Sequence, residues 1–169
     1  MEYPDIRKKK GPEFTVSHSP GSEQRSRIYK GTPEVEEGIM LALERVEFVY
    51  DYISGVTTDQ CLERKAKSHI FIDQIFSLIG MGKNGMEGIA LDCITMSSWT
   101  LFQPNDFYPP HPVLEIQNAK QVQNHIVSLI KNEKKYERLL KKTKKWKKYI
   151  GYKNTINYIA SVIGDQFKW

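Results

Sequence analysis

Between residues 32 and 55, apolar side chains recur every three or four positions, which is the spacing of one face of an α-helix. Thr32 can cap this helix, Pro33 suits its first position, and Gly55 supplies a stop. The pattern predicts one helix from Thr32 to the residue before Gly55, with an inward face made of Val35, Ile39, Leu43, Val46, Tyr50 and Ile53.

A second helix is predicted after the sequence TTDQ at residues 57–60, because a Thr followed three positions later by Gln has the form of a capping box. This helix would close at Gly80. Residues 86–102 favour a third helix, although a strand through IALDCITM is an open alternative. The buried face of the second helix would hold Cys61, Leu62, Ile72, Ile75, Phe76 and Ile79.

Four prolines fall within the eleven residues FQPNDFYPPHP, and proline disrupts both helices and strand ladders. We therefore expect a rigid surface connection there. A fourth helix would begin at Pro112 and run into the lysine-rich segment, either unbroken or bent near Asn132. The apolar segment TINYIASVIG, residues 155–164, would form a last short helix that is buried against the others or against a partner.

The first 31 residues contain few large apolar side chains and many Pro, Gly, Ser and charged residues, a composition typical of a flexible arm. Helical spacing dominates the remainder. The sequence therefore predicts an all-α fold: a compact bundle of four to five helices, residues 32–169, preceded by a disordered basic N-terminal arm, residues 1–31.

Composition places the helical part among globular domains, with 40% hydrophobic and 27% charged residues. The net charge of +5 is unevenly distributed. Residues 34–115 carry 5 basic and 13 acidic side chains, whereas residues 116–169 carry 13 basic and 3 acidic ones. This asymmetry predicts an acidic and a basic surface that serve different partners, or two parts that attract each other.

The two cysteines, Cys61 and Cys93, each lie in an apolar-periodic segment, where a reduced cysteine behaves as a small hydrophobic residue. No apolar stretch approaches the roughly 18 residues that cross a bilayer, so integral membrane insertion is not expected. The first eleven residues do not have the apolar core of a signal peptide. We expect an intracellular protein, cytoplasmic and also compatible with the nucleus.

Gly80, Gly82 and Gly85 match GxGxxG, and Asp106 follows at the distance of a ribose-binding acid. That fingerprint binds a dinucleotide only between a strand and a helix of a βαβ unit. Because the preceding residues are interpreted as a helix, we interpret the glycines as a loop between helices and predict no cofactor.

No catalytic or metal-binding constellation emerges. His69 and Asp73 are four residues apart on the expected second helix, but a third metal ligand at a suitable offset is missing. We interpret them as a hydrogen-bonded surface pair. The prediction is a protein with no catalytic residues and no metal site, that is, not an enzyme.

Residues 134–153 are the strongest candidate for an interaction site. As a helix they place Tyr136, Leu139, Leu140, Thr143, Trp146 and Ile150 on one side and lysines on the remaining arc. Lysines neutralise phosphates, and aromatic rings stack on unpaired bases. We therefore predict nucleic-acid binding, to RNA in the first instance, by Lys134, Lys135, Lys141, Lys142, Lys144, Lys145, Trp146, Lys147, Lys148, Tyr149 and Tyr152.

The sequence thus favours a small nucleic-acid-binding or nucleoprotein-associated regulatory protein. Its acidic helices, residues 34–79, or the apolar residues 156–163 would bind a protein partner. The alternative is an adaptor or host-interaction accessory protein whose lysines serve as a nuclear localisation signal or contact an anionic membrane peripherally. Whether Trp146 faces a ligand or the core stays open at this point.

Overall fold

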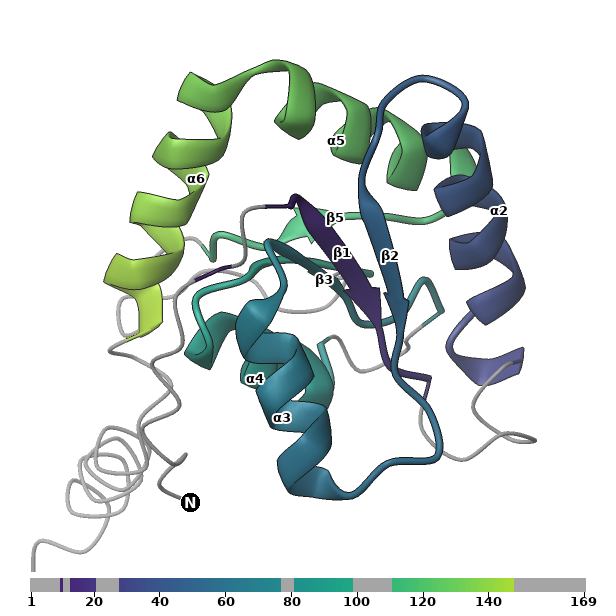
Figure 1. The fold of residues 1–169 in the computed structure, drawn as a ribbon, viewed down its shortest axis with the longest axis vertical. Coiled ribbons are helices and arrows are strands. Elements are labelled where there is room, and N and C mark those ends of the chain that lie inside the picture. The colour runs from purple at the N-terminus through teal and green to yellow at the C-terminus, as the bar shows by residue number, and fades with distance from the viewer. Residues whose placement is uncertain (1–9, 11–12, 21–27, 77–80, 99–110, 148–169) are drawn as a thin grey trace, which may run out of the picture.

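The computed structural model describes residues 10, 13–20, 28–76, 81–98 and 111–147, and it has an α/β fold in which helices cover a five-stranded parallel sheet (Figure 1). The predicted all-α bundle is therefore wrong. The strands are β1 (Thr15–His18), β2 (Val49–Tyr52), β3 (Ile70–Ile72), β4 (Ile94–Ser97) and β5 (Leu114–Glu115). The helices are α2 (Thr32–Leu43), α3 (Thr58–Lys67), α4 (Lys83–Ala90), α5 (Ala119–Lys131) and α6 (Glu133–Trp146).

The strands lie in the order β2-β1-β3-β4-β5, and every pair is parallel. From β1 the chain passes through α2 to β2 on one side, and then through α3 to β3 on the other side of β1. This reversal makes the gap between β1 and β3 the topological switch point, where ligands of doubly wound sheets bind at the carboxyl ends of the strands.

The strands were missed because all five have at most four residues and the inner ones are buried on both faces. β3 and β4 are buried along their whole length, so they show no alternation of apolar and polar positions. Residues 15–18, which lie in the predicted disordered arm, form β1 next to the centre of the sheet. Burial of Val16 between two neighbouring strands holds them there.

The predicted first helix is correct only up to Leu43. Gly31, with φ of 66°, precedes α2 as its N-cap residue, and Pro33 occupies the first turn. Beyond the helix, Tyr50 belongs to β2, so its place in the apolar period was coincidental. In the same way, the second predicted helix ends at Lys67 and its apolar continuation is β3. The capping box of Thr57 is confirmed.

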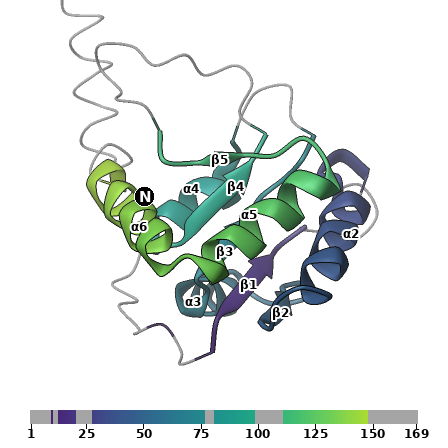
Figure 2. The same ribbon diagram turned by 90° about the horizontal axis from the view of Figure 1, so that it is seen from above.

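Two helical layers enclose the sheet. One is formed by α2 and α5, which cross closely: a Cβ on Gly38 would lie 2.6 Å from the carbonyl oxygen of Ala119. The other contains α4, where a Cβ on Gly88 would lie 2.8 Å from a ring carbon of Phe71. Figures 1 and 2 show α2 and α6 on opposite sides of the molecule, with the sheet between them.

The fourth predicted helix is divided. Residues 114–115 form β5, and α5 then begins at Ala119 behind the Asn118 cap. Of the two alternatives left open for this segment, the structure has the break at Asn132: this residue ends α5, and its side chain accepts a hydrogen bond from the amide of Lys135 in α6. The predicted helix at residues 155–164 lies outside the described residues.

Candidate functional site at the carboxyl edge of the sheet

A cavity of about 450 Å³ lies beyond the carboxyl ends of β1 and β2. The loops after β1 and β2 and the first turns of α3 and α4 form its walls. Its volume falls within the range of small-molecule sites. The cavity is lined by Ser19, Ile53, Ser54, Gly55, Val56, Thr58, Cys61, Lys83, Asn84 and Glu87.

Asp73 is the first residue after β3 and is fully buried. Its Oδ2 accepts hydrogen bonds from the amide of Gly82 at 3.0 Å and from the hydroxyl of Ser97 at 3.4 Å. Its Oδ1 has no hydrogen-bond partner within the described residues and lies 3.8 Å from Nζ of Lys30. Burial raises the pKa of Asp73, against the opposing charge of Lys30.

Lys30 lies two positions before the first residue of α2, and its side chain extends to this edge of the sheet. Its Nζ donates a hydrogen bond to the carbonyl oxygen of Ser19 at 3.2 Å, and its own carbonyl accepts one from the amide of Ile75. Burial lowers the pKa of Lys30, while Asp73 acts in the opposite direction. Lys30 therefore ties together the loops after β1 and β3, next to the cavity wall at Ser19.

His18 ends β1 and has a structural role. Its Nδ1 lies 2.8 Å from the carbonyl oxygen of Ile72, and its Nε2 lies 3.0 Å from the hydroxyl of Thr32. A carbonyl only accepts, so Nδ1 carries the proton and Nε2 accepts from Thr32. Desolvation by burial lowers the pKa of His18 to about 4, so the ring is neutral at pH 7. The imidazole thereby fastens α2 to the ends of β1 and β3.

A buried ion pair between Lys65 and Glu87 lies at the cavity wall. The side chain of Lys65 is 0% exposed, and its Nζ lies 2.6 Å from Oε2 of Glu87 and 2.6 Å from Oδ1 of Asn84. It also lies 4.7 Å from the ring centroid of Phe71. The contact between Nζ of Lys65 and Oε2 fixes the orientation of the Glu87 carboxylate. Its other oxygen, Oε1, lies 3.8 Å from Nζ of Lys83.

The glycine motif lies at this edge. Gly82 is the N-cap residue of α4 and offers no side-chain cap, and Gly85 is in the first turn. The segment joins β3 to α4 and is followed by β4, so its interpretation as a loop between helices is wrong: it lies within a βαβ unit. The first amides of a helix have no intrahelical partners and favour anions. Gly80 and Asp106 are outside the described residues.

The structure separates the other residues singled out as candidate chemistry. His69 and Asp73 flank the two ends of β3, so they form no helical pair. His69 stacks on Phe14 with ring centroids 4.7 Å apart, and its Nδ1 accepts a hydrogen bond from the amide of Thr15. Cys61 and Cys93 are free thiols. Among the described residues, no cluster of three His, Cys, Asp or Glu could hold a metal ion.

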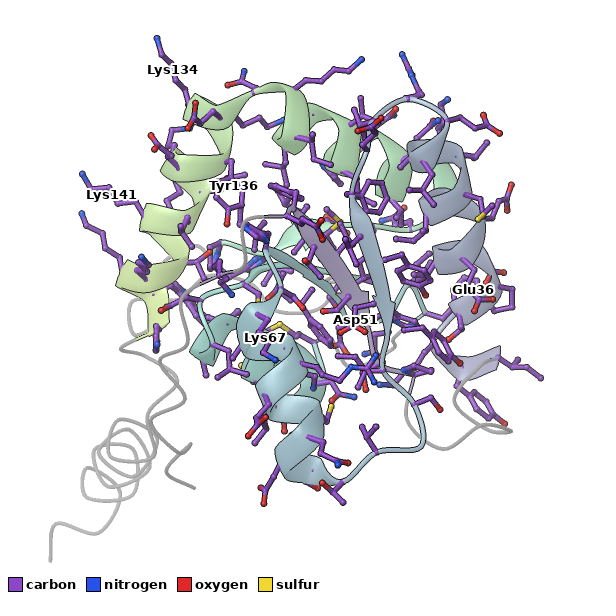
Figure 3. The ribbon with its side chains drawn as sticks, in the orientation of Figure 1. Glu36, Asp51, Lys67, Lys134, Tyr136 and Lys141 are labelled. Atoms are coloured by element: carbon purple, nitrogen blue, oxygen red, sulfur yellow. The ribbon has the colours of Figure 1, made fainter. Side chains whose placement is uncertain are left out.

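The predicted interaction residues lie on α6, away from this cavity. Their amphipathic arrangement is confirmed: Thr143 and Trp146 are buried, Tyr136, Leu139 and Leu140 are partly buried, and five lysines are exposed. Figure 3 shows Tyr136 directed toward the sheet and Lys134 and Lys141 directed away from it. Lys148, Tyr149 and Tyr152 lie outside the described residues. The exposed lysines of α6 are Lys134, Lys141, Lys142, Lys144 and Lys145, and Lys147 directly after the helix is exposed as well.

Trp146 belongs to the core. It is 5% exposed and packs with Ile89 of α4 and with Val113. Lys135 and Lys147 are also engaged: Lys135 donates to the hydroxyl of Ser128 at 2.8 Å, and Lys147 pairs with Asp92 at 3.2 Å. Of the predicted set, these three side chains hold α6 against the domain.

Sequence reasoning missed Lys30, Lys65, Asn84 and Glu87 because no run or spacing joins them, and it misinterpreted Asp73 as part of a surface pair with His69. One signal was present. TVSHS, IFID and CITMSS are short, β-branched-rich segments that end in polar residues, a pattern typical of buried parallel strands with functional groups at their carboxyl ends.

Comparison with known proteins supports the fold. No protein-family model matches the chain, and no curated protein matches it. Among solved structures, a spinosyn forosaminyltransferase is similar, with a TM-score of 0.53 and 10% sequence identity. The match covers 88% of this chain and 42% of that one, so the chain spans less than half the length of its neighbour. This likeness shows the α/β fold alone.

Proposed function

We propose that this chain binds a phosphorylated nucleoside at the carboxyl edge of its sheet. The observation that carries the proposal is the cavity beyond the carboxyl ends of β1 and β2, which is also lined by the first residues of α4, a helix whose N-terminus has no side-chain cap. In doubly wound sheets this location is the usual place for nucleotides, because loops diverge there and helix N-termini converge.

Each part of such a ligand has matching chemistry. The amides at the start of α4 and the ammonium group of Lys83, which lines the cavity, suit phosphate oxygens. The fixed carboxylate of Glu87 suits the hydroxyl groups of a ribose. Ile53 and Val56 supply the apolar wall that a base requires.

The similar solved structure is by name a transferase of a forosaminyl group. Under this proposal, the nucleotide would carry a group for transfer, and this chain would provide the nucleotide-binding part of the reaction. The prediction that the chain is not an enzyme stays a prediction, as does nucleic-acid binding.

The test is calorimetric titration of the protein with ADP, GDP, CDP, UDP and inorganic pyrophosphate. At least one nucleoside diphosphate should bind more tightly than pyrophosphate, because the nucleoside fills the cavity. Lys83→Gln should weaken the diphosphate by about fivefold, corresponding to about 1 kcal/mol for one partly exposed charge pair. The matched control is Lys67→Gln on the exposed C-terminal turn of α3.

A second variant locates the nucleoside. Val56 lines the cavity and is 37% exposed, so Val56→Trp fills the space without disturbing the core. This variant should reduce nucleoside diphosphate binding to the level of pyrophosphate and leave pyrophosphate unchanged. Equal binding by wild type and Val56→Trp, or no binding by any nucleotide, would contradict the proposal.

A further inference from the structure

The outward face of α6 is a second charged feature, independent of the cavity. It consists of Lys134, Lys141, Lys142, Lys144 and Lys145, which we name the basic face. With 3.6 residues per turn, these lysines spread over about 160° of the helix circumference, opposite the buried Thr143. Within the described part of the chain, none of the five forms an ion pair.

Contacts at both ends and along the inner side hold this helix in one orientation. Lys135 is bonded to Ser128 at the beginning, and Lys147 to Asp92 at the end. Between them, the ring of Tyr136 meets that of Phe14 edge-on, with centroids 5.5 Å apart, and Trp146 is buried. The basic face is therefore a fixed surface, and α6 cannot insert its apolar side elsewhere without leaving the core.

The burial of the aromatic rings of α6 indicates which kind of anionic partner the basic face can bind. Bases of single-stranded nucleic acid need exposed aromatic rings for stacking, and α6 buries Trp146 and directs Tyr136 toward the sheet (Figure 3). Base edges are read best by planar, bidentate groups, and within α6 the exposed Arg138 is the one arginine, whereas the five lysines are point charges without geometric selectivity. The basic face is thus better suited to phosphate groups that can move to meet the lysines than to the regularly spaced phosphates of a nucleic-acid backbone.

A hollow on the same helix fits this chemistry. It has a volume of about 470 Å³ and is lined by Leu140 and Glu137 together with Lys141, Lys144 and Lys145. Three ammonium groups at its rim can surround one phosphate headgroup, and they outnumber the single carboxylate. The side chain of Leu140 provides an apolar surface for the glycerol region next to the phosphate.

We propose that the basic face binds the headgroups of anionic phospholipids at a bilayer surface. The helix lies parallel to the membrane with its apolar side in the protein core, and it does not insert. Each lysine near such a surface contributes about a fivefold gain in binding, and the attraction weakens as salt screens it. Among the described residues, no helix is long and apolar enough to cross a bilayer.

The test is co-sedimentation of the full 169-residue chain with phosphatidylcholine vesicles that contain about 30% phosphatidylserine, at about 50 and 200 mM salt. We expect binding at low salt that weakens at high salt, and none to vesicles of phosphatidylcholine alone. The triple variant Lys141→Gln, Lys142→Gln and Lys145→Gln should lose about 100-fold in vesicle affinity, because three lysines are removed.

The matched control removes three exposed basic side chains from other surfaces, Arg45, Lys67 and Lys120, each changed to Gln. It has the same net charge as the basic-face variant and should retain most of the binding. An equal loss in both triples, or no binding to the anionic vesicles at low salt, overturns the proposal. Tighter binding to duplex DNA or single-stranded RNA than to the vesicles, lost in the basic-face variant, also overturns it in favour of nucleic acid.

Discussion

Lysines in two regions of this molecule have opposite surroundings. At the carboxyl edge, Lys65 is completely buried and lies 2.6 Å from the Glu87 carboxylate, and Lys30 lies 3.8 Å from Asp73. On α6 five lysines are exposed, and within the described residues they have no acidic partner. A buried charge must be paired to be tolerated, whereas an exposed charge is stabilised by water. The density of lysines along the sequence therefore says little about where charge is organised for specific chemistry.

Lys65→Met should produce the largest change in stability. It leaves the Glu87 carboxylate buried, with only the more distant Lys83 nearby, and should lower the free energy of unfolding by about 3 to 5 kcal/mol. Urea denaturation measures this. Adding Glu87→Gln removes the uncompensated charge and should restore a substantial part of the loss. A cost below about 1 kcal/mol for Lys65→Met would show that the pair is not buried in solution.

Trp146→Ala examines the inner side of α6. Because the ring packs against Ile89 and Val113, its removal should cost about 3 to 5 kcal/mol and lower the melting temperature. Lys145→Ala, one position earlier on the exposed side, is the matched control and should leave the melting temperature nearly unchanged. If both variants have the same melting temperature as the wild type, the tryptophan is not part of the core.

His18 makes the carboxyl edge sensitive to acid. Its pKa is about 4 in the folded protein, against the ordinary histidine value of 6.5 in the unfolded chain, so the unfolded chain binds more protons between these limits. The contribution of His18 to the free energy of unfolding is fully present above pH 6.5 and is lost as the pH falls toward 4. The total loss is about 3 kcal/mol. Unfolding free energies from pH 7 to pH 4 should show the decrease, and His18→Gln should remove part of the slope, because burial also lowers the pKa values of His69, His111 and His125.

The smallest effect is expected on the basic face. Changing Lys141, Lys142 and Lys145 together to Gln removes like charges at helical spacing, so stability should stay the same or rise by a few tenths of a kcal/mol. Thermal denaturation at low salt is the measurement. A loss above about 1 kcal/mol would mean that these side chains have partners, and the contrast with Lys65 would disappear.

The pattern of the sequence predicted the helices better than the strands. The first turn of α2 with Pro33, the capping box of α3 and the amphipathic arc of α6 follow from local signals, although the N-cap of α2 is Gly31 and not the predicted Thr32. Strands of three or four residues buried on both faces have no such period. A run such as IFI is equally compatible with a helix, and only its pairing with β1 and β4 decides otherwise.

The candidate site could not be predicted for a related reason. Lys30, Asp73 and Glu87 come from three separate segments, and only the parallel order of the strands brings their ends to one edge. The glycine motif was visible, but its meaning depends on the strand before it. That strand was hidden in a segment that was interpreted as a helix.

By itself, the sequence determined what depends on neighbouring residues: the first turn of α2, the capping box of α3, which side of α6 is apolar, and how charge is divided along the chain. The tertiary structure alone decided which apolar runs became strands, that Trp146 is core, and which lysines are paired. Helical periodicity and capping are local interactions, whereas strand pairing and the burial of charge depend on residues distant in the chain.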